Sequence, residues 1–202
     1  MPKVSAAHRA ARREQILGAA MRVVARKGFA GLTMADVITE AGLSAGAVYT
    51  YFPGKAEILA NLGGEEFASV LAALDTALDA DPMADPDRLL AVALTRVEAI
   101  WRQVDLDVAV AVIQVMAASM LSGEETVVHQ RIREIRSRWV TLARRLQDAG
   151  RLPADADPEA VGAVLLSLLP GFVLQSRILE PLDPLAYAAG LRALMTARLD
   201  PA

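Results

Sequence analysis

The segment from Thr33 to Phe52 narrows the possible folds of this chain more than any other part of its sequence. Thr33 directly precedes a predicted helix over 34–41, so its hydroxyl can accept a hydrogen bond from a free backbone N–H, and Asp36 follows as an acidic partner. Gly42-Leu43-Ser44 interrupts this helix, and Ser44 can cap a second helix over 45–52. Two short helices joined by a glycine-containing turn are typical of a helix-turn-helix unit.

Composition and periodicity predict helices in the rest of the chain as well. Apolar residues make up 54% of the sequence and aromatic residues only 4%, and the helix-favouring alanine and leucine dominate. An amphipathic helix over 9–27, ended by Gly28, precedes the helix-turn-helix unit. The other predicted helices cover 55–78, 86–103, 106–121, 124–149, 157–179 and 183–199. The expected fold class is therefore all-α, with about nine helices.

The charge of the chain is unevenly distributed. The formal net charge is −3, but residues 1–55 hold eight Lys and Arg against three Asp and Glu, a net charge of +5, which leaves −8 for residues 56–202. A basic N-terminal part on an acidic body is expected if only the N-terminal part meets a polyanion such as DNA.

The segment from Thr33 to Leu59 reads T-M-A-D-V-I-T-E-A-G-L-S-A-G-A-V-Y-T-Y-F-P-G-K-A-E-I-L. It resembles the helix-turn-helix signature of the tetracycline-repressor-like (TetR) family. The shared features are the capped first helix, the A-G-L-S turn, the V-Y-x-Y-F end of the second helix and the P-x-K-x-x-[IL]-L start of the next helix, in that order. With the helix over 9–27 included, the resemblance covers about a quarter of the chain.

This resemblance implies a DNA-binding transcriptional regulator with two domains. Residues 1–54 would form a three-helix DNA-binding domain, and residues 55–202 a helical ligand-binding and dimerisation domain. A homodimer would bind a palindromic operator on double-stranded DNA as a repressor and be released by a small, largely apolar effector. Activation of transcription, and control by a protein partner in place of an effector, remain open alternatives.

The second short helix is expected to enter the major groove. Its first residues are small, so its backbone can lie close to the base edges, and Tyr49, Thr50 and the Ala47 methyl would read the sequence, aided by DNA shape. The resemblance implies contacts with the DNA backbone from Thr33, Ser44, Tyr49, Thr50 and Lys55, and close approach to bases by Ala45, Ala47 and Tyr49. The predicted DNA-binding residues are Thr33, Ser44, Ala45, Gly46, Ala47, Tyr49, Thr50, Tyr51 and Lys55. Arg9, Arg12 and Arg13 are expected to reach a phosphate or the minor groove, whereas Thr33 and Ser44 would cap helices with or without DNA.

The last two predicted helices carry more apolar residues than one buried face requires, which indicates a partner surface. In the family that this chain resembles, the final two helices of each subunit form a four-helix dimer interface. The predicted interface residues are Val161, Val164, Leu165, Leu168, Leu185, Leu191, Leu194 and Met195. The alternative is that these residues cover only the core of their own chain.

The middle helices are expected to enclose the effector, because pockets between helices are mostly apolar with a few polar groups. The predicted effector-site residues are Phe67, Leu71, Trp101, Val112, Met116, Met120, Trp139, Phe172 and Gln175. Gln175 or Arg177 would supply a polar anchor. Taken alone, each of these residues is better explained by an ordinary core, and the prediction concerns the set.

Other classes of function find little support in the sequence. The chain has no cysteine and only two histidines, His8 and His129, so neither a metal site nor a cofactor is expected. It lacks the H-E-x-x-H, G-x-S-x-G, phosphate-loop and dinucleotide glycine patterns, and an enzyme is not expected. The longest apolar stretch, residues 160–174, is short for a membrane span and contains Pro170, so the prediction is a soluble, cytoplasmic protein without a membrane partner.

Overall fold

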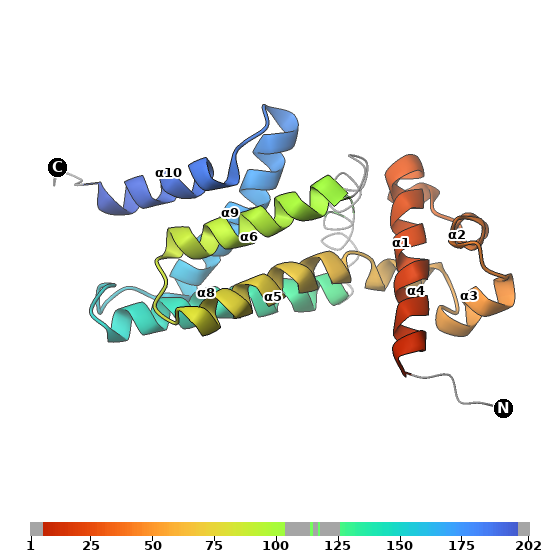
Figure 1. Cartoon of the computed structure of the whole chain (residues 1–202), viewed down its shortest axis with the longest axis horizontal. Helices are drawn as coiled ribbons and strands as arrows, with labels where there is room; N and C mark the ends of the chain where they lie inside the picture. The colour runs from red at the N-terminus through yellow and green to blue at the C-terminus, as the bar shows by residue number, and fades with distance from the viewer. Residues whose placement is uncertain (1–5, 104–113, 115–116, 118–125, 198–202) are drawn as a thin grey trace. The chain divides into compact units, whose positions relative to one another are not determined.

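The computed structural model describes residues 6–103, 114, 117 and 126–197, and every regular element within these residues is a helix (Figure 1). This confirms the predicted all-α fold class. The predicted helix over 106–121 lies almost entirely outside the described residues. The helices are α1 (Ala6–Gly31), α2 (Met34–Ala41), α3 (Ala45–Tyr51), α4 (Lys55–Asn61), α5 (Gly64–Ala80), α6 (Pro86–Gln103), α8 (Val127–Asp148), α9 (Pro158–Ile178) and α10 (Pro184–Thr196).

The chain divides into two compact units. The first unit comprises residues 1–65 and 101–130, and the second comprises residues 66–100 and 131–202. Three described helices therefore pass from one unit into the other, since α5 begins at Gly64, α6 ends at Gln103 and α8 begins at Val127.

The core of the first unit is the apolar face of α1. Its i, i+3, i+4 and i+7 positions are fully buried, as the sequence pattern predicts, and α1 packs against α2 with further contacts to α3 and α4 (Figure 1). The opposing helices contribute Val37, Val48 and Ile58, all fully buried. The buried α1 residues are Ile16, Ala19, Ala20, Val23 and Val24.

Gly28 breaks the helical geometry of α1 near its end, where the sequence predicts a helix stop. Its φ of 76° and ψ of 165° are non-helical, and helical geometry resumes as far as Gly31. A side chain would be strained at this positive φ, so glycine is required by the backbone here. The break releases the Phe29 N–H from the helix, and it donates to Gln114 Oε1 at 3.1 Å.

The prediction of one continuous helix over 55–78 is wrong. Helix α4 ends at Asn61, Gly63 has a positive φ of 80°, and α5 begins at Gly64. Two adjacent glycines allow this turn, and the second also permits close packing. A Cβ on Gly64 would lie 3.1 Å from Cγ1 of Val127 at the start of α8.

The second unit is a helical bundle whose members are tied together by charged pairs as well as by apolar packing. Arg138 of α8 makes a two-pronged contact with Asp75 of α5 at 2.7 and 3.0 Å, and this carboxylate raises the pKa of Arg138. The buried carboxylate of Asp87 in α6 accepts a 2.7 Å hydrogen bond from Arg192 Nε of α10. Burial of a carboxylate without such a partner would be costly.

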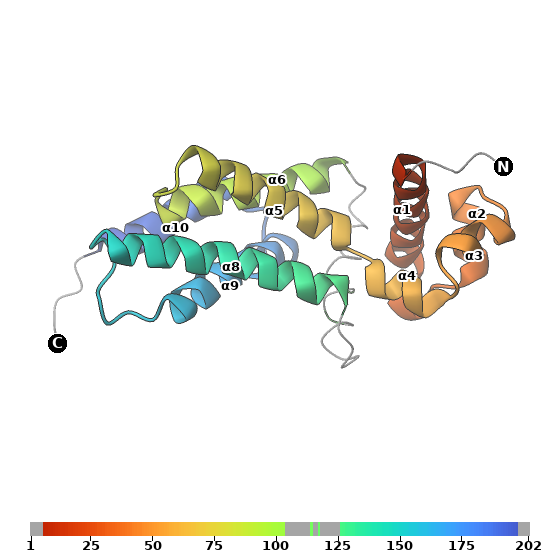
Figure 2. The same ribbon diagram turned by 90° about the horizontal axis from the view of Figure 1, so that it is seen from below.

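Helix α9 runs obliquely across α8, as Figures 1 and 2 show, and the two helices meet at Gly162. A Cβ on Gly162 would lie 2.5 Å from Val140 Cγ2 and 3.0 Å from Val140 N, so only glycine fits this crossing. Trp139, which precedes Val140, and Phe172 of α9 are among the largest fully buried side chains of the described residues.

Helix α9 is longer than the apolar stretch expected from the sequence. It covers 21 residues, with a mean hydropathy of 1.6 over its most apolar 18-residue window, and is the one described helix long and apolar enough to cross a membrane. Length and composition are weak evidence for a membrane span. Only 22% of that window is buried within this chain, which leaves much of its apolar surface without a partner among the described residues.

Candidate nucleic-acid interface and effector site

The turn between α2 and α3 has the caps that the sequence predicts. Thr33 Oγ1 accepts from Asp36 N at 3.2 Å and donates to Asp36 Oδ2 at 2.7 Å. Gly42 ends α2 in the left-handed region with a φ of 64°. Ser44 Oγ accepts from Ala47 N at 3.2 Å and so begins α3. These local bonds fix the angle between the two helices independently of any partner.

The outward face of α3 is small and open. Val48 and Phe52 are fully buried against the rest of the first unit, as expected. At about 100° per residue, Gly46 and Thr50 lie on the side of the helix opposite Val48, and both are exposed. A Cβ on Gly46 would meet nothing within 4 Å, so the backbone of α3 is accessible along this line.

The other predicted DNA-contact residues lie around the exposed side of α3 that carries Gly46 and Thr50. Ala45 is exposed and Tyr49 is 48% exposed, whereas Ala47 and Tyr51 are partly buried. Lys55, at the start of α4, is partly buried and donates from Nζ to Ala30 O at 3.1 Å. The structure thus gathers these residues on and beside α3.

Three of the basic residues of α1 are paired with acidic residues of α2. Arg22 and Arg26 contact the two carboxylate oxygens of Glu40 at 2.7 and 2.5 Å, and Lys27 contacts Asp36 at 2.7 Å. Hydrogen bonds from Arg22 and Arg26 lower the pKa of Glu40. Bonds from Lys27 and Thr33 lower the pKa of Asp36. These pairs hold α2 against α1.

Arg13 has a structural role that sequence reasoning missed. Its guanidinium donates to Tyr51 O at 3.2 Å and to Asn61 Oδ1 at 3.3 Å, and it lies 4.4 Å from the centre of the Phe52 ring. It therefore joins α1 to the ends of α3 and α4. Arg12, by contrast, makes a local 2.7 Å bond to Gln15.

Residues 16–62 match the sequence profile of the bacterial regulatory proteins of the tetR family. The N-terminal part of this chain therefore carries a DNA-binding domain of the TetR type. A 57-residue stretch is 47% identical to the uncharacterized HTH-type transcriptional regulator YfiR of Bacillus subtilis and covers 28% of each chain. A 64-residue stretch is 34% identical to the HTH-type transcriptional repressor KstR of Mycobacterium tuberculosis, covering 32% of this chain and 29% of KstR. The matches thus span under a third of these relatives, and they confirm the predicted family resemblance.

Solved structures extend the likeness of this TetR-type chain to nearly its whole length at the level of fold. FadR from Bacillus subtilis, in complex with stearoyl-CoA, superposes with a TM-score of 0.73 at 16% identity and covers 91% of this chain and 97% of FadR. A TetR transcription regulator from Haloarcula marismortui gives a TM-score of 0.72 at 22% identity and covers 92% and 96% of the two chains. The helical C-terminal region therefore shares their fold.

The predicted effector-site residues fall in different environments. Leu71, Trp139 and Phe172 are buried in the second unit, Phe67 is partly buried, and Gln175 is exposed. Val112, Met116 and Met120 lie outside the described residues, as does the side chain of Trp101.

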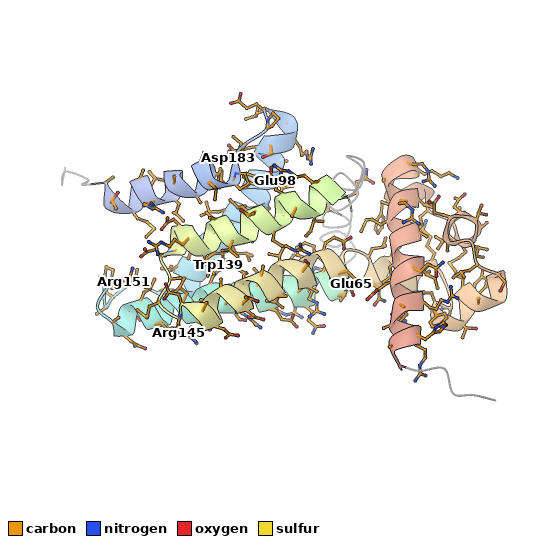
Figure 3. All side chains as sticks on the ribbon, in the orientation of Figure 1. Glu65, Glu98, Trp139, Arg145, Arg151 and Asp183 are labelled. Carbon is orange, nitrogen blue, oxygen red and sulfur yellow. The ribbon has the colours of Figure 1, made fainter. Side chains whose placement is uncertain are left out.

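Trp139 carries an unusual polar atom for a core residue. Its side chain lies inside the helical bundle of the second unit (Figure 3), and its buried Nε1 has no hydrogen-bond partner among the described residues. A buried donor without an acceptor costs about 1–3 kcal/mol. Trp139 therefore has a buried donor available to an effector.

The predicted dimer residues divide between core and surface. Val164, Leu185, Leu194 and Met195 are 61%, 62%, 76% and 53% exposed, whereas Leu165 is buried in its own chain. Val161, Leu168 and Leu191 are partly buried. Three further apolar residues, Leu174, Ile178 and Leu179, are exposed towards the end of α9, and sequence reasoning missed the last two. We call these seven exposed residues the α9/α10 apolar face.

Proposed function

We propose that this TetR-type protein is a transcriptional repressor that binds a palindromic operator on double-stranded DNA as a homodimer. The observation that carries the proposal is the outward face of α3, which is small, exposed and held by capped ends within a TetR-family domain. Such a helix fits the major groove with its backbone close to the base edges.

We assign DNA binding, effector binding and dimerisation to the two domains expected from the sequence. Residues 1–54 would bind DNA, and residues 55–202 would bind the effector and form the dimer. Two symmetric subunits can place their recognition helices one DNA turn apart, about 34 to 36 Å. The α9/α10 apolar face supports pairing through these helices, because isolated soluble chains rarely leave so many large apolar side chains exposed.

The hydrogen bonds of the first unit refine the proposed contacts. Ser44 Oγ uses a lone pair for Ala47 N, so its hydrogen can be donated to a phosphate. Lys55 uses one of three ammonium hydrogens for Ala30 O and can donate the others to a phosphate. The Thr33 hydroxyl already accepts and donates within its own cap, so we assign Thr33 primarily to holding α2.

We propose a small, largely apolar effector whose binding in the second unit releases the DNA. The buried side chains of Leu71, Trp139 and Phe172 offer apolar contacts, and Trp139 Nε1 offers one donor for an effector oxygen. The fold neighbour FadR is described with stearoyl-CoA, and the relative KstR is described as a repressor. The first description favours an effector site and the second favours repression, and we place both activities of this protein in the cytoplasm.

The test begins with purified full-length protein and a library of random double-stranded DNA. Repeated selection of bound fragments should enrich one inverted repeat, and sedimentation should show a homodimer on it. Adding effector candidates, with stearoyl-CoA as the first probe, should raise the melting temperature of the protein and lower its affinity for the repeat. Absence of any salt-sensitive preference among sequences, without effector present, contradicts the proposed function.

A further inference from the structure

The hydroxyl hydrogen of Thr50 is already engaged inside α3. Thr50 Oγ1 lies 2.8 Å from Gly46 O, one turn earlier, and donates its hydrogen to that carbonyl. Threonine makes this bond readily in helices because its hydroxyl lies beside the preceding turn. The oxygen therefore keeps only its lone pairs for a partner outside the helix.

The position of Thr50 directs those lone pairs away from the protein. Fully buried Val48 marks the inner side of α3, and Thr50 lies two residues further, at roughly 200° around the helix. Its side chain is exposed, and the space beside Gly46 is open. In a major groove, this side of the helix would face the floor, where the base edges lie, and not the phosphates along the rims.

We propose that Thr50 is a specificity-determining residue that accepts a hydrogen bond from an exocyclic amino group, adenine N6 or cytosine N4. These amino groups are the donors that bases present in the major groove. Phosphate oxygens, guanine O6 and N7, and thymine O4 only accept, so they cannot pair with an oxygen whose hydrogen is held by Gly46. This inference rests on the proposed function, and it replaces the DNA-backbone contact that the family resemblance implies for Thr50.

The test uses Thr50→Val, which keeps the shape and a methyl group of threonine but removes the acceptor. Wild-type protein and Thr50→Val are compared on the selected operator and on all its single-base-pair variants. The variant dimer loses one hydrogen bond in each half-site, so operator binding should weaken about tenfold or more. Thr50→Val should also lose its preference at one base pair in each half-site, with unchanged preferences elsewhere and unchanged salt dependence.

Modified bases then identify the atom that Thr50 reads. At the affected position, adenine is replaced by 2-aminopurine or cytosine by 2-pyrimidinone, because both lack the amino group in the major groove. Wild-type binding should fall about tenfold, whereas Thr50→Val binding should not change. The matched control is Thr141→Val in α8, which removes an exposed threonine with the same 2.8 Å bond to the carbonyl four residues earlier, here Ser137 O. It should leave all DNA measurements unchanged.

A uniform loss of affinity on every sequence, or equal sensitivity of both proteins to the modified bases, would overturn the role of Thr50. Wild-type protein without any sequence preference would instead overturn the proposed function, so the two failures are distinguishable. If Thr50→Val does not fold, Thr50→Ser replaces it: serine keeps the acceptor and should retain the sensitivity to the modified bases. Insensitivity of folded Thr50→Ser to them would also contradict the proposal.

Discussion

At position 46, folding and DNA binding make opposite demands on the side chain. Glycine within a helix costs about 0.5–1 kcal/mol of stability relative to alanine. A Cβ on Gly46 would meet nothing within 4 Å, so folding alone favours alanine. Close approach of the α3 backbone to DNA bases favours glycine.

Gly46→Ala should therefore separate the two properties. We expect the free energy of unfolding to rise by about 0.5–1 kcal/mol, because alanine restricts the unfolded chain more than glycine does. Operator affinity should fall about tenfold or more, because the added methyl occupies the space next to the bases. Urea unfolding and operator titration measure the two effects. Unchanged operator affinity would show that this side of α3 does not lie against DNA.

Arg13 should stabilise the first unit and contribute little direct contact with DNA. Arg13→Met keeps much of the apolar stem but removes the bonds to Tyr51 and Asn61. We expect a loss of about 1–3 kcal/mol in the free energy of unfolding. The salt dependence of DNA binding, measured where the variant is folded, should be unchanged.

Arg12→Met is the matched control, since Arg12 bonds only to its neighbour Gln15 among the described residues. It should change the free energy of unfolding by less than about 0.5 kcal/mol. If Arg13 contacts a phosphate instead, the slope of log affinity against log salt concentration should fall by about 1 for each subunit, or about 2 for the Arg13→Met dimer.

The roles of individual residues could be predicted from sequence only where their partners are near in the chain. Thr33 and Ser44 bond to backbone groups three residues away, and a short pattern therefore predicts both caps. Arg13 bonds to Tyr51, 38 residues away, and no local pattern contains that information. The exposure of Leu174 likewise depends on how α9 crosses α8.

The crossing of α8 and α9 depends on the absence of a side chain at position 162. Gly162→Ala would place a methyl 2.5 Å from Val140 Cγ2 and 3.0 Å from a backbone nitrogen, which cannot move alone. We expect a loss of about 1–3 kcal/mol in the free energy of unfolding from this overpacking. The same substitution at Gly46 has the opposite expected sign, so it serves as the control in urea unfolding. Equal stabilisation of both variants would show that the helices can separate at little cost.

The pairing of α1 with α2 should make the first unit sensitive to acid. Folding lowers the pKa of Asp36 and Glu40 below their ordinary values of 3.8 and 4.5. Their contribution to stability is therefore complete above these ordinary values, and it is lost as the pH falls through the lower pKa values of the folded state.

Glu40→Gln tests this dependence, because it removes the charge that pairs with Arg22 and Arg26. Wild-type stability, followed by thermal unfolding from neutral pH to below 3.8, should decline more steeply than that of the variant over the acidic part of this range. Parallel curves for the two proteins would indicate that the Glu40 pairs add nothing measurable, as occurs for many exposed ion pairs.

The ends of a helix could be predicted where a local sequence signal, such as a capping side chain, marks them. They could not be predicted where contacts with other helices set the end. Helices α2 and α3 match their predicted ranges closely because both begin at side-chain caps. The break between α4 and α5 was missed because apolar periodicity continues across it. The two glycines at 63 and 64 were the available signal, and their role follows from the left-handed turn and the contact with Val127.

For the whole molecule, the strongest expectation is that a dimer forms through the α9/α10 apolar face. Leu194→Glu would place a charge on this face, which should prevent pairing because an unpaired charge is costly in an apolar interface. Sedimentation should then show a monomer at micromolar concentration. Affinity for the inverted repeat should fall strongly, while the weak affinity for a half-site should remain.

Val92→Glu is the matched control, because Val92 is an exposed large apolar residue outside that face, on α6. This variant should remain dimeric and bind the inverted repeat like the wild-type protein. If Leu194→Glu also remains dimeric, the subunits must pair through another surface.

The three ion pairs between α1 and α2 bear on how the protein finds its operator in a genome. Random DNA attracts proteins through phosphate neutralisation, and each cation that meets a phosphate releases condensed counterions. Arg22, Arg26 and Lys27 are engaged by Glu40 and Asp36, which offset two of their three charges, so fewer of the eight basic side chains of residues 1–55 are free to meet a phosphate. Weaker binding to random DNA leaves more of the protein free to reach its operator. Contacts with the bases must then supply a larger share of the binding free energy at the operator.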